Sequence, residues 1–305
     1  LSTKLTEPQF AEQYTPFRLD LTSAAEPTEL EVTIVRDGVR YQYGFSYDAQ
    51  RIRAEWLIVY RKGKGQHWFE RQYDARKKED VWASFSSYFK GERETWRKTT
   101  RPQALFLTTA VQLNSDQLAP LFDWFINGMT LLTGNGELDP LRTLQRLDDA
   151  KFKARILELL RAADINVADI RVDKVPGHQF ELRVTPGKPA EISTSDGDIP
   201  DVKFVHKAAS GERVAFDQRF ESAGTQRMFA YAGPVIDAIE GGKLLVIDEL
   251  DRSLHPLLAR FIVRLMHNPA VSTKAAQLWI TTPDTTLLDT DLLRRTLPFG
   301  RHAYY

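Results

Sequence analysis

The 305-residue chain contains no cysteine, which excludes disulfide bonds and thiolate metal sites and is typical of a reducing cytoplasm. It has no apolar run near the roughly 18–20 residues that a membrane-spanning helix needs. It also carries no net charge, because 41 Lys and Arg residues balance 41 Asp and Glu residues. Contact with nucleic acid would therefore need a local basic patch. We expect a soluble, cytoplasmic protein without contact to a membrane.

A phosphate loop of the form Gly-x-x-x-x-Gly-Lys-Ser/Thr is also missing from these residues. The strings Lys62-Gly63-Lys64-Gly65 and Gly134-Asn135-Gly136 contain closely spaced glycines but not this pattern. The chain begins at Leu1 rather than at a methionine, and no signal-peptide pattern opens it. We therefore expect further N-terminal sequence before Leu1.

Residues 1–76 contain the alternation of apolar and polar residues that is typical of antiparallel strands. Alternation over residues 30–34 and 39–45 flanks Asp37-Gly38, a signal for a type I′ hairpin turn. The largely apolar segment 54–60 follows as a further strand. We therefore predict an antiparallel β-subdomain over residues 1–76.

Residues 77–200 are predicted to form a helical insertion. Apolar residues at spacings of three and four indicate helices near Glu79–Phe89 and over Ser115–Leu132. Segment Asp148–Ala163 is the clearest amphipathic helix. Its apolar face consists of Phe152, Ile156, Leu159 and Leu160. Pro and Gly recur over residues 174–200, which predicts hairpins and loops there.

Residues 201–305 alternate strands and helices, the pattern of an α/β fold with a parallel sheet. The short apolar run Lys243–Ile247 is typical of a buried parallel strand, and Gln277–Thr281 predicts a second one. The other predicted elements are strands Val202–His206 and Val214–Phe220, and helices Ser222–Glu240, His255–His267 and Thr285–Arg295.

Two acidic residues, Asp248 and Glu249, follow the first of these buried strands directly. The carboxyl edge of a parallel sheet is where α/β proteins hold ligands. Asp248 could hold Mg²⁺ through the ion's water shell, and Glu249 could polarise an attacking water as a general base. The alternative is a strand followed by an acidic helix cap.

Three further polar segments lie near these acids in sequence. Ser222–Arg227 begins a predicted helix, where Ser222 is an N-cap, Gly224 permits close approach to the backbone, and the helix N-terminus favours a terminal phosphate. An ordinary capped helix is the alternative. Asp251–Pro256 is a loop that leads into a helix, since Pro favours the first helical turn. Ile280–Asp284 is a strand that runs into a polar loop.

The order of these four segments resembles that of the SMC-like class of ABC-type ATPases, in which a signature motif, a Walker B strand, a D-loop and a switch region follow one another. The string ESAGTQRMFAYAGPVIDAIEGGKLLVIDELDRSLHP is similar to bacterial AAA-family ATPases typified by RloA and the abortive-infection ATPase AbiLi. Upstream, EPTELEVTIVRDGVRYQYGF and ALFLTTAVQLN resemble the β-subdomain and the helical part of that group. The resemblance covers nearly the whole chain.

The resemblance implies an α/β P-loop NTPase fold: an ABC-type ATPase head with an antiparallel β-subdomain, a helical insertion and a core over residues 201–305. It also implies that two heads, in a homodimer or a higher homo-oligomer, hold ATP and Mg²⁺ between them. One head would supply Asp248 for the metal and Glu249 for catalysis, and the other would present its signature motif in trans. The remaining expected site residues are Ser222, Ala223, Gly224 and Thr225 of the signature motif, Asp251, Ser253 and His255 of the D-loop, and Thr282 and Pro283 of the switch region.

Two features depart from the family pattern. The family's phosphate loop lies upstream of the β-subdomain, so we expect it before Leu1. The family also has a His, which contacts the γ-phosphate, where this chain has Pro283. Since Pro has neither a side-chain donor nor an N–H, the resemblance leaves turnover at this site open.

Relatives in this group are cytoplasmic ATPases of anti-phage defence loci and commonly act with a nuclease, often of the Toprim type. The resemblance thus implies an ATPase that controls such an effector, with a nucleic acid or a phage component as its trigger. A DNA repair or maintenance ATPase is an alternative, although no heptad repeat for a coiled-coil arm is present. A catalytically dead assembly scaffold is another, favoured by Pro283 and the missing phosphate loop.

The other conspicuous residues are assigned to the core or to the solvated surface. Tryptophans in apolar runs are usually core residues, and we expect this of all six. The basic residues around Trp96 are expected on a solvated helix face rather than on a nucleic-acid site. They are Arg93, Arg97, Lys98 and Arg101. The histidines show no metal-ligand spacing.

Overall fold

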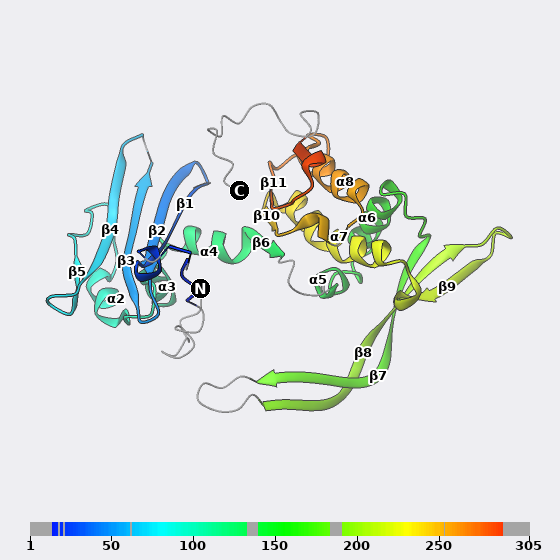
Figure 1. Ribbon diagram of the computed structural model, residues 1–305, viewed down its shortest axis with the longest axis horizontal. Helices are drawn as coiled ribbons and strands as arrows, with labels where there is room; N and C mark the ends of the chain where they lie inside the picture. Colours follow the sequence, from blue (N-terminus) through cyan, green and yellow to red (C-terminus); the bar gives the residue numbers. More distant parts are fainter. Residues whose placement is uncertain are drawn as a thin grey trace. The chain divides into compact units, whose positions relative to one another are not determined.

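The computed structural model describes residues 14–17, 19–20, 22–61, 63–132, 140–183, 191–252 and 254–288. They belong to two compact units, the first up to residue 126 and the second comprising residues 127–183 and 192–288 (Figure 1). Each unit has its own hydrophobic core. The division of the chain at residues 76 and 200 stays a prediction.

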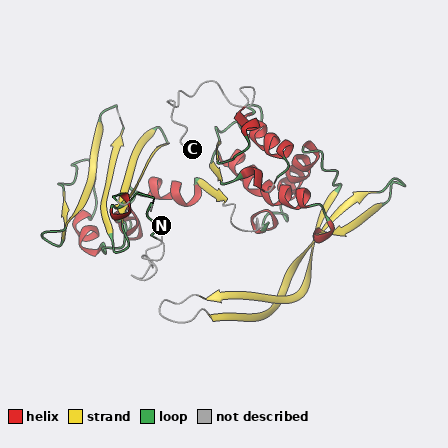
Figure 2. Ribbon diagram, viewed as in Figure 1, coloured by secondary structure: helices red, strands yellow, loops and turns green. Residues whose placement is uncertain are grey.

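The first unit contains a five-stranded antiparallel sheet (Figure 2), and its strands lie in sequence order, as labelled in Figure 1. The strands are β1 (Thr28–Arg36), β2 (Val39–Tyr47), β3 (Ile52–Tyr60), β4 (Gly65–Asp74) and β5 (Glu79–Trp82). Asp37 and Gly38 join the first two with φ angles of 52° and 74°, as a type I′ turn requires. The predicted hairpin and the strand after it are therefore confirmed.

The described part of the first unit also contains three α-helices and a short 3₁₀ helix before the sheet. They are α2 (Arg93–Thr99), α3 (Phe106–Gln112), α4 (Ala119–Asn127) and η1 (Ser23–Ala25). The basic cluster lies in and just after α2, where Arg97 pairs with Glu94 at 2.6 Å and only Trp96 of the helix is buried. Arg97 is part-exposed, which fits the expected solvated helix face.

The helix predicted near Glu79–Phe89 is wrong. The first four residues are β5, which pairs antiparallel with β4, and the rest is not helical. The three-to-four spacing of Trp82, Phe85 and Phe89 reflects an aromatic cluster instead. These rings pack on Phe106 of α3 with centroids 5.1, 5.8 and 6.3 Å away. Tertiary packing thus reproduces a helical spacing in a segment without a helix.

An ion pair lies at the centre of the first unit, between neighbouring strands. Glu55 and Arg71 are 0% and 1% exposed, and Arg71 Nη2 lies 3.0 Å from Glu55 Oε2. Glu55 also accepts hydrogen bonds from the backbone N–H groups of Phe106 and Leu107, at 2.7 and 2.9 Å. Because Leu105 at the start of α3 offers no side-chain cap, Glu55 caps this helix from the sheet.

The second unit contains a three-stranded parallel sheet in the order β11-β10-β6. The strands are β6 (Met129–Leu132), β10 (Leu244–Ile247) and β11 (Gln277–Ile280). Both pairings of the central strand β10 are parallel, so the predicted parallel α/β sheet is confirmed. Leu245 and Ile247 face the core, whereas Leu131 and Trp279 on the flanking strands are 55% and 53% exposed. The core assignment of Trp279 is therefore wrong.

The single helix predicted over Ser115–Leu132 is also wrong, because its last four residues are β6. Gly128 separates this strand from α4. A short apolar run such as Met129–Leu132 cannot be assigned to helix or strand by periodicity. The segment is a strand because it pairs in parallel with β10, which lies more than a hundred residues later in the chain.

Four α-helices and three 3₁₀ helices belong to the described part of the second unit. They are α5 (Leu141–Leu144), α6 (Ala150–Ala162), α7 (Ala223–Gly241), α8 (Pro256–His267), η2 (Gln218–Phe220), η3 (Leu250–Arg252) and η4 (Thr285–Leu288). The predicted face of α6 is confirmed, since all four of its apolar residues are buried. Asp149 caps this helix by accepting from Lys151 and Phe152 N–H groups. The helix predicted from Thr285 is the 3₁₀ helix η4, and its remainder lies outside the described residues.

Helix α7 runs through the centre of the core and contains a proline, Pro234. Since Pro lacks an N–H, it leaves the carbonyl of Ala230 without its usual helical donor. Thr143 of α5 lies beside this break: its hydroxyl is 3.1 and 3.3 Å from the carbonyls of Phe229 and Ala230 and accepts from Gly233 N–H at 3.0 Å. A Cβ on Gly233 would lie 2.5 Å from the Thr143 hydroxyl, so this contact requires glycine.

Three long or exposed strands form the remaining sheet of the second unit, in the order β7-β8-β9. They are β7 (Asp169–Arg183), β8 (Glu191–Lys207) and β9 (Arg213–Asp217). The segment 174–200 was predicted as hairpins and loops; its described residues lie in the neighbouring strands β7 and β8, and the connection at 184–190 lies outside the described residues. The strand predicted over Val214–Phe220 ends at Asp217, where η2 begins. Among the described residues no helix is long and apolar enough to cross a membrane.

Candidate functional site

Asp248 and Glu249 lie at the carboxyl end of the central strand β10, as predicted. Asp248 N–H still donates to the carbonyl of Leu132 on β6, at 2.9 Å. The next residue, Glu249, leaves the sheet with a φ angle of 53°, in the left-handed region that non-glycine residues rarely adopt. Both acidic residues are half-buried.

Thr281 at the end of β11 contacts both acids. Its hydroxyl donates to Asp248 Oδ1 at 2.5 Å and accepts from Glu249 N–H at 2.8 Å. Sequence reasoning placed this threonine at the end of the predicted strand Gln277–Thr281, where the chain runs into a polar loop, and assigned it no contact with the acids. This contact could have been inferred from the predicted parallel pairing of the two strands, because the carboxyl ends of parallel strands meet at one edge of the sheet.

One residue from the predicted D-loop, Asp251, also meets one from the predicted switch region, Thr282. Thr282 donates its hydroxyl hydrogen to Asp251 Oδ1, with 2.6 Å between the oxygens. His255 caps α8 by accepting from Leu257 N–H through Nδ1 at 3.3 Å, while Pro256 occupies the first turn. Pro283 is exposed. Ser253 lies outside the described residues.

Asp284 follows Pro283 and shapes the turn after the switch region. Its carboxylate accepts from Thr286 N–H at 2.9 Å. Hydrogen bonds from the side chain and the backbone of Thr286 lower the pKa of Asp284, and the nearby charge of Arg260 acts in the same direction. These hydrogen bonds therefore favour the ionised carboxylate, which is the stronger acceptor for Thr286 N–H.

The predicted signature segment forms the first turn of α7. Ser222 is the N-cap: its hydroxyl oxygen accepts from Thr225 N–H at 3.1 Å and lies 2.9 Å from the Thr225 hydroxyl. Ser222 and Ala223 are exposed, Gly224 is half-buried and Thr225 is buried. The helix therefore presents its N-terminus, with the positive end of its dipole, to solvent.

A histidine that sequence reasoning assigned no role supports the residue before this N-cap. His206 Nε2 lies 2.7 Å from the Glu221 carboxylate, and Nδ1 lies 2.9 Å from the carbonyl of Asn166. Gln226 in the first turn donates to the carbonyl of Glu221 at 2.9 Å. Strand β8 and helix α7 thus fix the approach to Ser222 from both sides.

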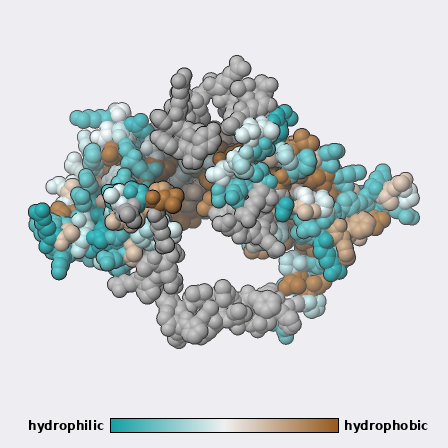
Figure 3. Space-filling view, viewed as in Figure 1, coloured by the Kyte–Doolittle hydropathy of each residue, from teal (hydrophilic) through white to brown (hydrophobic). Residues whose placement is uncertain are grey.

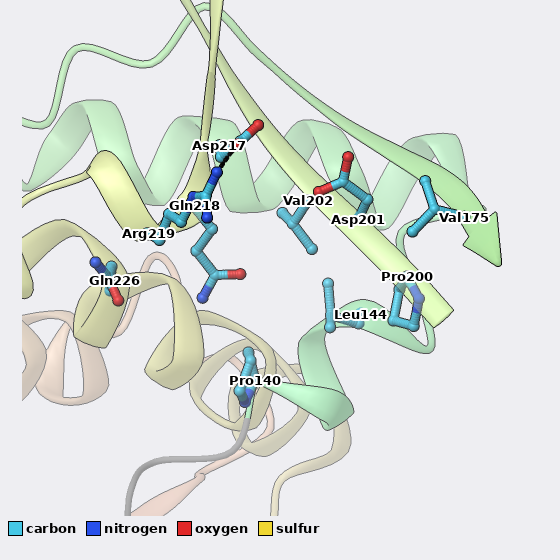
Figure 4. A pocket seen from close by; sticks show the side chains of 10 residues that line it. All are labelled: Pro140, Leu144, Val175, Pro200, Asp201, Val202, Asp217, Gln218, Arg219 and Gln226. Atoms are coloured by element: carbon cyan, nitrogen blue, oxygen red, sulfur yellow. Dashed lines mark hydrogen bonds and ion pairs between the residues drawn. The ribbon is translucent and has the colours of Figure 1, made fainter. Parts of the chain in front are cut away.

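A groove of about 710 Å³ lies beside the same helical turn. Figure 4 shows the ion pair between Asp217 and Arg219, 3.2 Å apart, on one side of it and Leu144 on another. Gln226 contributes to its wall. The lining mixes both charges with apolar residues, so the groove offers no single ligand chemistry.

The acidic edge fits a magnesium ion better than a metal that needs several protein ligands. Among the described residues, no group of three or more His, Cys, Asp or Glu side chains could hold a metal. Mg²⁺ retains several of its waters and takes one or two carboxylates. With Thr281 on Oδ1, Asp248 still has Oδ2 as an acceptor. The donor set therefore fits hydrated Mg²⁺.

A parallel sheet with acids at the carboxyl end of its central strand, packed with helices in a mixed α/β unit, is the arrangement expected of an AAA-type domain. The family model described as "AAA domain, putative AbiEii toxin, Type IV TA system" matches residues 11–289. The chain belongs to this family. No curated protein matches it significantly.

Proposed function

We propose that the chain is an ABC-type ATPase head that dimerises around ATP and Mg²⁺ and thereby controls a partner effector in bacterial anti-phage defence. The observation that carries the proposal is the acidic turn Asp248–Glu249 at the end of β10, held by the end of the neighbouring parallel strand β11. The family description, which names a toxin–antitoxin system, supports the defence context.

In this proposal the two acids have separate roles. Asp248 holds Mg²⁺ through its waters, and Glu249 accepts a proton from the attacking water. Bound Mg²⁺ would supply neutralisation of the phosphate charge. The left-handed backbone at Glu249 ends the extended conformation of β10 at this residue.

The first turn of α7 is proposed to contact the terminal phosphate in trans. Ser222, Ala223, Gly224 and Thr225 form this contact through the first turn of the helix, where backbone N–H groups lack an intrahelical acceptor. Thr225 N–H is already capped by the Ser222 hydroxyl, so the backbone contribution would come from the residues before it. Gly224 is informative, because glycine costs about 1 kcal/mol relative to alanine inside a helix. The nearest side-chain atom would lie 3.7 Å from a Cβ at this position, so internal packing does not require glycine. The close approach of a ligand to the backbone would require it.

The partner head would face the D-loop residues Asp251, Ser253 and His255. Because ATP would bind only the closed dimer tightly, binding shifts the equilibrium toward it and hydrolysis releases it. We propose that this cycle governs a cytoplasmic effector, such as a Toprim-type nuclease.

The test uses the full-length natural protein. Glu249→Gln should abolish hydrolysis and accumulate a dimer in saturating ATP and Mg²⁺, measured by light scattering after gel filtration. Glu212→Gln, in the exposed turn before β9, is the matched control and should behave as wild type. A Glu249→Gln protein that stays monomeric in ATP while binding it would refute the composite site.

A scaffold that binds nucleotide without turnover is the second candidate. Pro283 favours it, because neither its side chain nor its backbone can donate a hydrogen bond to a γ-phosphate. For the scaffold, wild type and Glu249→Gln would dimerise equally in ATP and neither would release phosphate. Pro283→His would then be the variant that introduces hydrolysis.

A further inference from the structure

Thr281 is bonded to four consecutive residues of the neighbouring segment. Its backbone N–H donates to the carbonyl of Ile247, and its carbonyl accepts from Leu250 N–H, both at 3.1 Å. Between these, its side chain contacts Asp248 and Glu249. One residue thus fixes the whole path of the chain from the end of β10 to the start of η3.

The direction of both side-chain bonds follows from the groups involved. The Glu249 N–H can only donate, and an ionised Asp248 carboxylate can only accept. The Thr281 hydroxyl therefore points its hydrogen at Asp248 and its lone pair at Glu249. The contact to Asp248 is short because hydrogen bonds to a charged acceptor are shorter and stronger than neutral ones.

The backbone at Glu249 needs such support. A φ angle of 53° is unfavourable for a residue with a Cβ, and it persists only where surrounding contacts impose it. The N–H groups of Glu249 and Leu250 both donate to Thr281, to its hydroxyl and to its carbonyl. These two bonds set the direction in which the Glu249 side chain leaves the main chain.

The next residue continues the contact. Thr282 bonds Asp251, so two successive threonines contact every residue from Ile247 to Asp251. The hydroxyl of Thr281 contacts both acids of the turn. Valine has the same shape as threonine but lacks this hydroxyl, whereas serine retains it.

We propose that Thr281 is a positioning residue of the acidic turn: its hydroxyl holds Asp248 in one orientation toward the metal and Glu249 in the backbone conformation that catalysis requires. This inference rests on the proposed ATPase function. In this role Thr281 acts through the two acids rather than on the reacting atoms.

The first test needs no nucleotide and uses the chain itself. Amide hydrogen exchange of Glu249 is compared in wild type, Thr281→Val and Thr281→Ser. Loss of the hydroxyl should speed exchange of this amide at least about threefold, and serine should restore protection. Thr285→Val, on the exposed η4 in the same segment, is the control and should leave exchange unchanged. Thr281→Ala repeats the loss of the hydroxyl should the valine variant not fold.

The second test measures steady-state hydrolysis in the complete protein. Thr281→Val should lower kcat on the order of 10–100-fold, with KM for ATP changed less than about threefold, because misplacement of catalytic groups acts on the chemical step. Thr281→Ser should recover most of kcat. Unchanged amide exchange in Thr281→Val, or altered exchange with an unchanged kcat, would overturn the positioning role. If the wild-type protein binds but never hydrolyses ATP, the proposed function fails and this inference falls with it, whatever the exchange data show.

Discussion

Replacing Glu55 by alanine should destabilise the first unit more than most single substitutions. Glu55 accepts hydrogen bonds from the Tyr43 hydroxyl, from Arg71 and from two N–H groups of α3, all within 3.0 Å. Burial, followed by the adjacent Glu55 charge, holds the pKa of Tyr43 well above its usual value, so Tyr43 remains a donor. The alanine variant leaves these donors without an acceptor.

The magnitude follows from the burial of Arg71. Removing one partner of a buried ion pair costs about 3–5 kcal/mol, because the other charge remains buried and unpaired. Arg71 Nε and Nη1 already have no partner, and its other described hydrogen bond goes to the carbonyl of Ala104. The two α3 N–H groups that lose Glu55 as acceptor cost about 1–3 kcal/mol each. Part of this cost is already contained in the figure of about 3–5 kcal/mol for the broken ion pair. We therefore expect a loss of about 4 kcal/mol.

Urea unfolding followed by tryptophan fluorescence is the assay, because this signal comes mainly from the first unit. Five of the six tryptophans lie there: Trp56, Trp68, Trp82, Trp96 and Trp124. At a slope of about 1.5 kcal/mol/M, the midpoint should fall by roughly 2–3 M. The exposed Glu29→Ala on β1 should change stability by less than about 0.5 kcal/mol.

A double substitution separates the pair from the rest of the core. Glu55→Leu with Arg71→Met should be less destabilised than the sum of the two single variants, since neither charge is then left alone. Strict additivity, or a loss below about 1 kcal/mol for Glu55→Ala, would refute the reasoning.

Two further predictions concern the second unit. Gly233→Ala should destabilise it by about 1–3 kcal/mol, because the new Cβ would meet Thr143 side-chain and backbone atoms at 2.5–3.0 Å. Adding Thr143→Ser should not restore stability, since the Thr143 backbone atoms remain. Thermal unfolding by circular dichroism measures both variants, and an unchanged midpoint in Gly233→Ala would count against the close contact. Asp284, with its pKa lowered below 3.8 by Thr286, contributes stability that is present above that value and is lost as the pH falls through the folded pKa. Carbon-detected NMR titration should give a midpoint below 3.8 in wild type and a higher one in Thr286→Val, and a wild-type midpoint at or above 3.8 would contradict the bonding described.

Local sequence signals predicted the elements that local physics determines. The Asp37-Gly38 turn sets the register of the first hairpin, because few residue pairs accept two positive φ angles. The apolar face of α6 and the Ser222 cap of α7 were also predicted from the sequence, since both depend on residues within one or two helical turns. The acids after β10 were found because a short apolar run followed by two carboxylates is itself a pattern.

Contacts between distant residues decided what these signals left open. Apolar Met129–Leu132 is a strand because β10 pairs with it, and the aromatic spacing after β5 reflects packing on α3 rather than a helix. The residues next to Glu55 and Arg71 in sequence do not predict that these two side chains form a buried ion pair. The role of Thr281 likewise needs the parallel pairing of β10 and β11. The sequence by itself determined which residues could carry the chemistry; tertiary pairing decided which ones meet, because a hydrogen bond across 33 positions has no signature in either segment alone.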